Sequence, residues 1–586
     1  MKDDQKNFIL FAVFAALMLF GWPILTSKFF PAANPPVTKV AGGKTQILPS
    51  PTNTSATPAA GTNGAVRDRK VVLAESPRVR IETPALNGSI SLKGARIDDL
   101  VLSTYNETID KHSPPITLLS PAGTAKSYFA GFGWAGDNVA APDKNTLWTA
   151  DKPVLTPGSP VTLSWQNPQG LVFQIIVAVD EHYMFSVTQR VGNRGAAPVS
   201  IHSYGFVSRL GGAKDVDTWT NHVGPIGVFG DGATYDIGYP NLAGKEASFF
   251  GKLFGSSAKP GANYFDANGG WLGFSDKYWL TALIPDQKAA VHSGFPAASG
   301  DAYQADYTTK PVSLAPGAVA TQSSRFFAGA KEVRLTDHYQ DDLHIANFDK
   351  AIDWGWFRVV EKPIFYYLDW LFRMVGNFGV AIILLTLTIR GLLFPIAQRQ
   401  FASMANMRAI QPKMKALQEK HKDDKARQQQ EVMALYKAEK VNPLAGCLPT
   451  FLQIPIMYSL YKVLLLTIEM RHQPFVLWIK DLSAPDPLTP LNLFGILPFT
   501  PPTMIAIGVI PILLGISMYF QFKLNPAPMD EAQKQVFAIM PWVLMFVMAP
   551  FAVGLQVYWI TSNCLTILQQ RLLYARHPGM KVAAAK

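Results

Sequence analysis

One arginine stands in an otherwise apolar run, and the residues around it limit the chemistry that it can do. Residues 383–398, ILLTLTIRGLLFPIAQ, have the composition of a membrane-spanning helix that Arg390 interrupts. A charge near the centre of a bilayer costs about 2.5–3.5 kcal/mol on insertion scales. Neither this run nor the four apolar runs that follow it contain Asp or Glu. The guanidinium therefore either reaches the membrane surface along its own flexible stem or lines a hydrated cavity that receives a polar partner.

Polar side chains in the same apolar runs favour the cavity. Thr386 comes one helical turn before Arg390. In the last run, polar residues recur at i, i+7, i+10 and i+14, which places them along one stripe of a helix. The candidates are Thr386, Gln453, Ser459, Ser517, Gln556, Asn563, Thr566 and Gln570. Each could simply bond a neighbouring helix, but together with Arg390 they predict a hydrated cavity inside a helical bundle.

Six apolar runs are available to position these residues in a membrane. The first, residues 8–25, is as long as a full span and has no clear cleavage site, which favours an uncleaved anchor over a signal peptide. The others are residues 378–396, 447–468, 503–521, 536–551 and 554–574. The connection 397–446 carries ten basic and five acidic residues. By the positive-inside rule this connection and both termini are cytoplasmic, and residues 27–350 lie outside.

The basic connection itself has a helical pattern. Its two helical segments are separated by a break at residues 421–424, where Asp423 or Asp424 could cap the second helix. We therefore expect an antiparallel cytoplasmic hairpin over 397–446 that presents a basic surface to a protein or to the ribosome. The residues expected to make this contact are Arg408, Lys413, Lys415, Lys420, Lys422, Lys425 and Arg427.

The large region between the first two apolar runs has a different residue composition. Residues 28–69 are rich in Pro, Ala, Thr and Gly and predict a flexible linker. Residues 70–337 contain short runs with strand character, such as LVFQIIVAVD at 171–180, separated by turn residues, which predict a large all-β sandwich. Residues 338–377 are expected to be connecting helices that end in an amphipathic helix lying in the membrane interface. The histidines and carboxylates of the β region show no motif spacing, although a sugar-binding or epimerase-like site is an alternative.

Charge and cysteine content exclude several function classes. The net charge is +11, but the β region is nearly neutral, so the basic excess lies around the apolar runs. That distribution suits an anionic membrane surface better than a nucleic acid. Cys447 and Cys564 are the two cysteines, which is too few for a zinc or iron–sulfur site, and no phosphate-binding G-x-x-x-x-G-K-[ST] occurs. No metal and no cofactor are expected.

Four stretches resemble a known family. They are TIRGLLFP at 388–395, the long segment from SMANMRAIQPKMKALQEKH to FLQIPI at 403–456, FVLWIKDLSAPDP at 475–487 and GLQVYWITSNCLTILQQ at 554–570. These residues closely resemble the YidC/Oxa/Alb family of membrane protein insertases over about 350–575. The β region resembles, more loosely, the periplasmic domain of the Gram-negative members.

The resemblance implies a fold and a site. It implies a polytopic α-helical protein of the bacterial inner membrane, with six transmembrane helices of which five form the insertase core at 378–575. A short basic tail follows at 576–586, and the β domain lies in the periplasm. It also implies a positively charged groove, open to cytoplasm and lipid, in which Gln453 matches a groove-lining glutamine and Thr386 a substrate-contacting threonine. Tyr558 and Trp559 stand where the family often has two tyrosines. The groove residues expected in this chain are Arg390, Thr386, Gln453, Gln556, Tyr558, Trp559 and Asn563.

The resemblance also implies partners and a function. The substrates are nascent membrane proteins, which are inserted and helped to fold either alone or with the Sec translocon. Ribosome binding is expected through the cytoplasmic hairpin rather than the short tail. No covalent bond changes, so the protein is not expected to be an enzyme. One alternative is a secondary transporter of an organic anion with Arg390 as the substrate clamp, although no internal repeat supports it. A carbohydrate-active β domain tethered by the helices is a weaker alternative.

Overall fold

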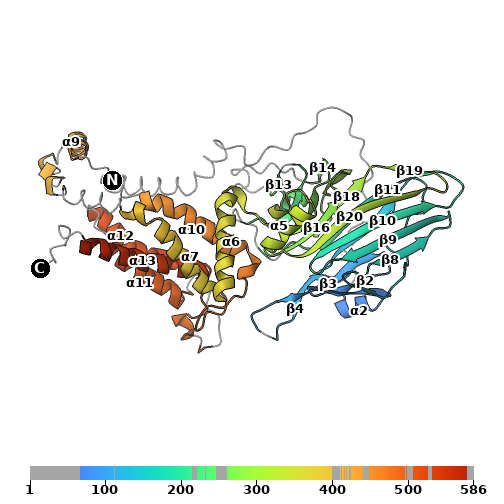
Figure 1. The fold of residues 1–586 in the computed structure, drawn as a ribbon, viewed down its shortest axis with the longest axis horizontal. Helices are drawn as coiled ribbons and strands as arrows, with labels where there is room; N and C mark the ends of the chain where they lie inside the picture. Colours follow the sequence, from blue (N-terminus) through green and yellow to red (C-terminus); the bar gives the residue numbers. More distant parts are fainter. Residues whose placement is uncertain are drawn as a thin grey trace. The chain divides into compact units, whose positions relative to one another are not determined.

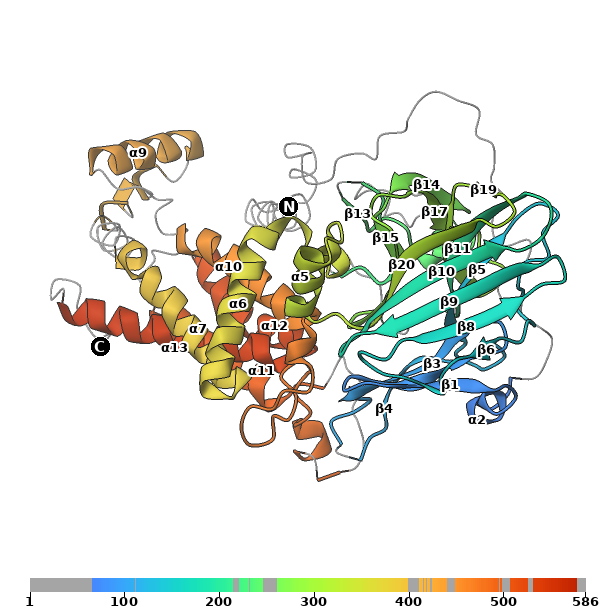
Figure 2. The same cartoon turned by 45° about the vertical axis from the view of Figure 1, so that its right-hand side comes forward.

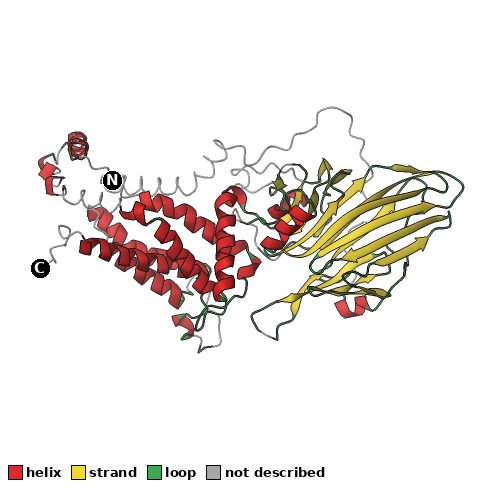
Figure 3. Ribbon diagram, in the orientation of Figure 1, coloured by secondary structure: helices red, strands yellow, loops and turns green. Residues whose placement is uncertain are grey.

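Two compact units make up the described part of the chain. The computed structural model describes residues 66–398, 410–439 and 448–576, except 111, 214, 216–220, 231, 246–260, 411, 415, 418, 422–423, 495, 498–505 and 525–530. One unit ends at Asp353 and the other begins at Trp354. In Figure 3, which is coloured by secondary structure, the first unit consists mainly of strands and the second of a bundle of helices. The predicted anchor at 1–27, most of the linker, the end of the tail, and Arg408, Lys415 and Lys422 lie outside the described residues.

The first unit is a sandwich of two large sheets, as expected from the sequence (Figure 1). One sheet has the strand order β14-β17-β18-β11-β5-β3-β2-β1-β7, with β19 paired to β11 and β4 paired to β3. Its strands are β1 (Arg78–Glu82), β2 (Leu86–Ser91), β3 (Arg96–Asn106), β4 (Pro115–Leu119), β5 (Tyr128–Ala135), β7 (Val154–Leu155), β11 (Val199–Leu210), β14 (Asn263–Asn268), β17 (Ala290–Phe295), β18 (Ala302–Thr309) and β19 (Val312–Leu314). Pairing in this sheet is antiparallel except between β1 and β7.

The second sheet has the order β13-β12-β15-β16-β20-β10-β9-β8-β6. Its strands are β6 (Thr149–Ala150), β8 (Val161–Gln166), β9 (Leu171–Val179), β10 (Met184–Asn193), β12 (Gly224–Val228), β13 (Ala233–Thr234), β15 (Trp271–Ser275), β16 (Trp279–Pro285) and β20 (Val319–Ala330). Alternate residues of β9 are buried along the whole strand, because successive side chains of a strand point to opposite faces of its sheet. The two sheets meet through aromatic contacts, such as Phe132 with Phe326 at 6.3 Å between ring centroids.

Short helices complete the β unit. They are α2 (Arg69–Leu73), α3 (Tyr239–Leu242), α5 (Val333–Asp342) and the 3₁₀ turn η3 (Phe348–Ala351). Helix α5 buries Val333, Leu335 and Tyr339, and the Tyr339 ring packs edge-on against Phe327 of β20. The sequence boundary placed between residues 337 and 338 therefore falls inside a helix. The β unit continues to Asp353, because α5 and η3 pack onto the strands that precede them.

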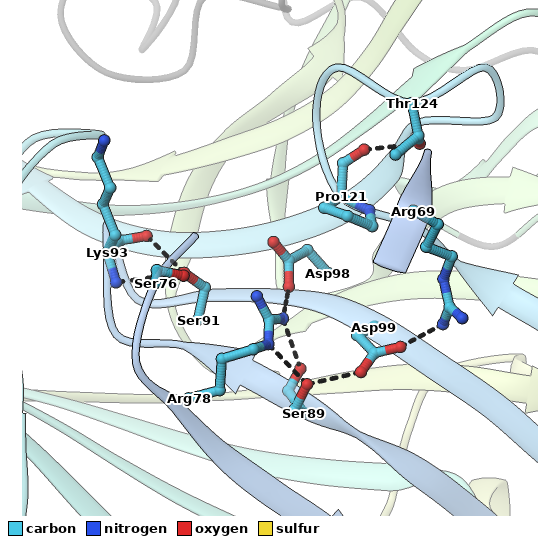
Figure 4. Close-up of polar contacts among 10 residues, drawn as sticks. All are labelled: Arg69, Ser76, Arg78, Ser89, Ser91, Lys93, Asp98, Asp99, Pro121 and Thr124. Atoms are coloured by element: carbon cyan, nitrogen blue, oxygen red, sulfur yellow. Dashed lines mark hydrogen bonds and ion pairs between the residues drawn. The ribbon is translucent and has the colours of Figure 1, made fainter. Parts of the chain in front are cut away.

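A polar network fixes the beginning of the β unit (Figure 4). Arg78 of β1 forms an ion pair with Asp98 of β3, and its Nε donates to Ser89 Oγ at 2.7 Å. Ser89 in turn donates to Asp99 Oδ2 at 2.6 Å, and Asp99 pairs with Arg69 of α2. Burial raises the pKa of Asp98, an effect that Arg78 partly offsets. The network ties the first helix of the unit to three neighbouring strands.

The second unit is a bundle of helices (Figure 2). Its elements are η4 (Gly355–Phe357), α6 (Arg358–Val375), α7 (Phe378–Leu392), α9 (Lys425–Ala438), α10 (Leu448–Leu466), η6 (Ile468–Met470), η7 (Pro490–Asn492), α11 (Val509–Leu524), α12 (Glu531–Met548) and α13 (Val553–Arg576). Helix α13 packs against α7, α10 and α11, while α6 packs against α7 and α10. The bundle therefore has α13 at its centre.

Large apolar side chains remain on the outside of this bundle. The exposed ones on α7, α11, α12 and α13 are Val380, Leu387, Leu392, Leu513, Ile516, Tyr519, Phe520, Ile539, Trp542, Val543, Phe546, Val547, Leu568 and Leu572. Soluble proteins seldom expose so many neighbouring apolar side chains, so such a surface marks contact with protein or membrane.

Among the described residues, no helix combines the length and the apolar composition that a membrane crossing requires.

Helix α6 contains the segment expected to lie in the membrane interface. It buries Phe365, Leu368 and Leu371. The structure also buries the carboxylate of Asp369, which accepts from Arg373 Nε at 3.0 Å. The outward side of the helix instead carries exposed apolar residues, namely Val359, Trp370, Met374 and Val375.

A candidate polar groove between three helices

Arg390 lies in the last turn of α7, where a cation complements the partial negative charge of a helix C-terminus. The helix begins at the cap residue Asn377, whose side chain accepts from Val380 N–H at 3.1 Å. Arg390 Nε donates to Ser562 Oγ of α13 at 3.1 Å, and its Nη2 donates to the same oxygen. Within the described ranges, no carboxylate lies within ion-pair distance of Arg390. The guanidinium is therefore held by a neutral hydroxyl.

A second hydrogen bond brings α10 to the same place. Gln453 Nε2 donates to the hydroxyl of Tyr558 at 2.5 Å, and Tyr558 lies close enough to Arg390 for an electrostatic interaction. Tyr558 and Ser562 are four residues apart on α13, so they lie on the same face of that helix. The structure thus gathers Arg390, Gln453, Tyr558 and Ser562 from α7, α10 and α13.

The remaining residues expected in the groove have other positions. Thr386 is buried, and its hydroxyl donates to Ile382 O of its own helix at 2.6 Å. Trp559 is partly exposed, whereas Tyr558 is buried, so these two neighbours differ in environment. The side chains of Gln556 and Asn563 bond elsewhere on the bundle. Gln556 Nε2 donates to Met548 O and Phe551 O, both at 2.9 Å, and Asn563 Nδ2 donates to Ser517 Oγ of α11 at 2.9 Å.

The polar side chains of α13 therefore lie in two neighbourhoods. Tyr558 and Ser562 meet α7 and α10, while Gln556 and Asn563 meet the end of α12 and α11. Ser562 was not among the predicted groove residues, although its spacing of four from Tyr558 was a usable signal. Lys462 of α10 and Glu361 of α6 were not predicted either; both are buried, on helices that pack together.

Part of the basic hairpin is described. Asp424 caps α9, because its side chain accepts from Arg427 N–H at 3.0 Å. Of Asp423 and Asp424, the two caps predicted from the sequence, the cap is therefore Asp424. Lys413 Nζ lies 2.6 Å from Glu439 Oε1, and the Tyr436 hydroxyl donates to Met414 Sδ at 3.2 Å. These contacts join the segment before the break to the end of α9. Lys413, Lys420 and Arg427 are exposed.

Comparison with known families and proteins gives matches over nearly the whole chain. The family model for the YidC periplasmic domain matches residues 78–367, and the model for the 60Kd inner membrane protein matches residues 370–580. The membrane protein insertase YidC of Zymomonas mobilis subsp. mobilis is 48% identical over 577 residues, which cover 98% of this chain and 96% of that protein. This chain belongs to the YidC membrane protein insertase family. YidC of Methylobacterium radiotolerans is 44% identical over 601 residues, covering 99% of this chain and 96% of its own.

The YidC assignment confirms the resemblance inferred from the sequence motifs. A solved structure of an active YidC insertase with its first transmembrane domain resolved is 17% identical, with a TM-score of 0.36, and the match covers 85% of this chain and 93% of that one. The β unit is the YidC periplasmic domain, and the protein is a membrane protein insertase of the inner membrane rather than an enzyme. The assignment favours insertion over both the transporter and the tethered carbohydrate-active enzyme.

Proposed function

We propose that this insertase moves polar segments of nascent membrane proteins through a hydrophilic groove lined by Arg390, Gln453, Tyr558 and Ser562. One observation carries the proposal. Arg390 is held between helices by the hydroxyl of Ser562 and, over the part of the chain that the structure describes, has no acidic partner. Arg390 is partly buried, and removing a charge from water without a counter-ion is costly, so its partner is expected to arrive with the substrate.

The geometry suggests how the groove lowers the cost of insertion. A guanidinium has five N–H donors in a fixed fork, and Ser562 accepts from only one side of that fork. Donors remain for a carboxylate or a peptide carbonyl of the translocating segment. Attraction is stronger in such a site than in bulk water because the local dielectric constant is lower. The apolar helix of the substrate then leaves sideways into lipid, and no covalent bond is made or broken.

The proposed function includes a topology. Residues 8–25 and the five later apolar runs cross the inner membrane, with both termini and 397–446 in the cytoplasm and the β domain in the periplasm. The distribution of basic residues supports this orientation, and the exposed apolar side chains of α7, α11, α12 and α13 suit contact with lipid.

Two partnerships complete the proposal. Lys413, Lys420 and Arg427 are exposed on the hairpin and suit an acidic surface on the ribosome. Arg408, Lys415, Lys422 and Lys425 are proposed for the same contact from their place in the sequence alone. Cooperation with the Sec translocon is proposed from membership of the family.

Substitution of Arg390 tests the groove. Two clients that differ only in the charge of the translocated segment are inserted into reconstituted vesicles. If Arg390 acts by general attraction, Arg390→Lys retains most activity and Arg390→Ala impairs the acidic client more than the neutral one. The matched control is Arg571→Ala, an exposed arginine near the end of α13, which should insert both clients normally.

Each of the other possible results of this experiment would contradict part of the role proposed for Arg390. Equal loss for both clients would give Arg390 a structural role and contradict the attraction proposed here. A bidentate clamp would reject Lys, since an ammonium cannot replace the guanidinium fork. A fully active Ala variant would remove Arg390 from the mechanism.

A further inference from the structure

The connection between α10 and α11 leaves several large apolar side chains exposed. It spans residues 467–508, of which 467–494, 496–497 and 506–508 are described. The exposed apolar residues are Val476, Leu477, Leu491, Leu493, Phe494, Ile496 and Leu497. Ile496 is 79% exposed and Phe494 is 54% exposed. A gathered apolar patch of this kind marks a surface that contacts membrane or protein.

Hydrogen bonds hold most of these residues in one turn, at 489–497. The Thr489 hydroxyl donates to Asn492 Oδ1 at 3.0 Å, and Phe494 N–H donates to Thr489 O at 2.9 Å. Leu497 N–H donates to Asn492 O at 3.1 Å. Leu493 and Phe494 have φ values of 48° and 56°, in the left-handed region that residues with side chains rarely adopt. Strained backbone of this kind persists where the surrounding structure enforces it.

The turn is attached to the beginning of α11. Asp486 Oδ2 accepts from Ile510 N–H at 2.8 Å, and Val509 N–H donates to Leu488 O at 3.0 Å. Helix α11 then continues with exposed Leu513 and Ile516. The residues just before the 489–497 turn are therefore bonded to the beginning of α11, whose outward side is apolar.

The charge pattern indicates which surface covers this patch. Residues 487–508, PLTPLNLFGILPFTPPTMIAIG, contain no Asp, Glu, Lys, Arg or His. A protein interface normally adds charged or polar groups at its rim, and these set specificity. A segment without any charge suits contact with the acyl chains of a bilayer, which need no complementary group.

We propose that the 489–497 turn inserts Leu493, Phe494 and Ile496 into the outer leaflet of the inner membrane, at the boundary between headgroups and acyl chains. The proposal rests on the topology given above, in which 467–508 lies on the periplasmic side. Apolar side chains buried at this boundary bind a membrane in proportion to their area. The turn thereby holds the beginning of α11 at a fixed depth, next to the bundle that receives the substrate.

The test measures the depth of Phe494 in the full chain. Phe494→Cys is introduced into a variant with Cys447→Ser and Cys564→Ser, labelled with an environment-sensitive dye and reconstituted in phosphatidylethanolamine–phosphatidylglycerol vesicles. Nitroxide-labelled lipid should quench this dye, while aqueous iodide should not. Leu513→Cys on α11 is the lipid-facing control, and Asn145→Cys, exposed in the β domain, is the aqueous control.

A neighbouring substitution tests the apolar contact itself. Ile496→Asp, combined with the labelled Phe494→Cys, should lower lipid quenching and raise iodide quenching, because a carboxylate resists entry into the leaflet. Ile496 is already exposed, so this change leaves the packed part of the connection intact.

Three results would overturn the proposal. Quenching of position 494 by iodide alone, with position 513 quenched by lipid, would place the turn in water while the proposed bundle stands. Protection of position 494 from both quenchers would mean that the β domain or a second copy covers it. Failure of lipid to quench position 513 would refute the proposed topology, and this proposal with it.

Discussion

At the residue scale, Ser562 is a positioning residue for Arg390. It is buried and accepts from two nitrogens of the guanidinium. A hydrogen bond to a charged group contributes about 1.5–3 kcal/mol, so Ser562→Ala should release Arg390 from its position between α7 and α13. We expect reduced insertion of the client with an acidic segment and a smaller effect on the neutral client, in the vesicle assay.

The neighbouring Thr561 provides the control. Its hydroxyl donates to Val557 O within the same helix at 2.8 Å, so Thr561→Ala removes a hydroxyl without touching Arg390. It should insert both clients normally. Faster insertion by Ser562→Ala would contradict the positioning role and show that Ser562 competes with the substrate for the guanidinium.

Asp306 makes the stability of the β domain depend on pH. Burial in β18 raises its pKa to about 7, compared with about 3.9 in an unfolded chain. Gln304 Nε2, which donates to Asp306 Oδ2 at 2.6 Å, partly offsets this effect. Between about pH 4 and 7 the folded state binds more protons than the unfolded state, so this carboxyl lowers the free energy of unfolding as pH rises.

The substitution Asp306→Asn should remove that dependence. We expect the variant to match the unmodified protein near pH 4, below which the carboxyl is largely protonated in both states, and to be more stable near pH 8, where the buried carboxylate is charged. Urea denaturation of the full chain in detergent, followed by protease resistance of the β domain, measures the difference. Equal stability of the two proteins at both pH values would mean that Asp306 does not titrate in this window.

At the scale of elements, the network on β1–β3 predicts unequal roles for two arginines of one strand. Arg78 and Asp98 are largely buried, whereas the pair Arg80–Glu82 has side chains 68% and 51% exposed. Breaking a buried pair costs about 3–5 kcal/mol because one charge is left uncompensated, while exposed pairs contribute about 0–1 kcal/mol. Arg78→Ala should therefore lower the urea midpoint of the β domain strongly, and Arg80→Ala should hardly change it. Similar midpoints for the two variants would contradict this assignment.

At the scale of the whole molecule, the proposed topology can be tested by labelling. Single cysteines are placed at Asn145 and Lys420, both exposed, in a chain without Cys447 and Cys564. A membrane-impermeant maleimide should label position 145 from the periplasm of intact cells and position 420 only after the membrane is opened. Labelling of both positions from the same side would refute the six-span arrangement.

Much of the fold followed from local sequence patterns. The apolar run LVFQIIVAVD predicted a strand, and the structure has β9 there with alternate residues buried, because a strand places successive side chains on opposite faces. The all-β character of the large domain and the family were likewise evident from sequence. The predicted boundary at residue 337 falls inside α5, because whether this helix belongs to the sandwich depends on its packing against β20 rather than on its own composition.

The sequence by itself determined which residue types are present at the site, and only tertiary structure decided which of them meet. Arg390 without a nearby acid, Gln453 and Tyr558 could all be named from spacing and motif. Adjacent residues of a helix point about 100° apart, so Ser562 and Asn563 face different neighbours, and the sequence does not show which helix each of them meets. The rotation of α13 against α7 and α11 directs Ser562 to Arg390 and Asn563 to Ser517. That rotation is set by the packing of several helices at once, which no local pattern in the sequence records.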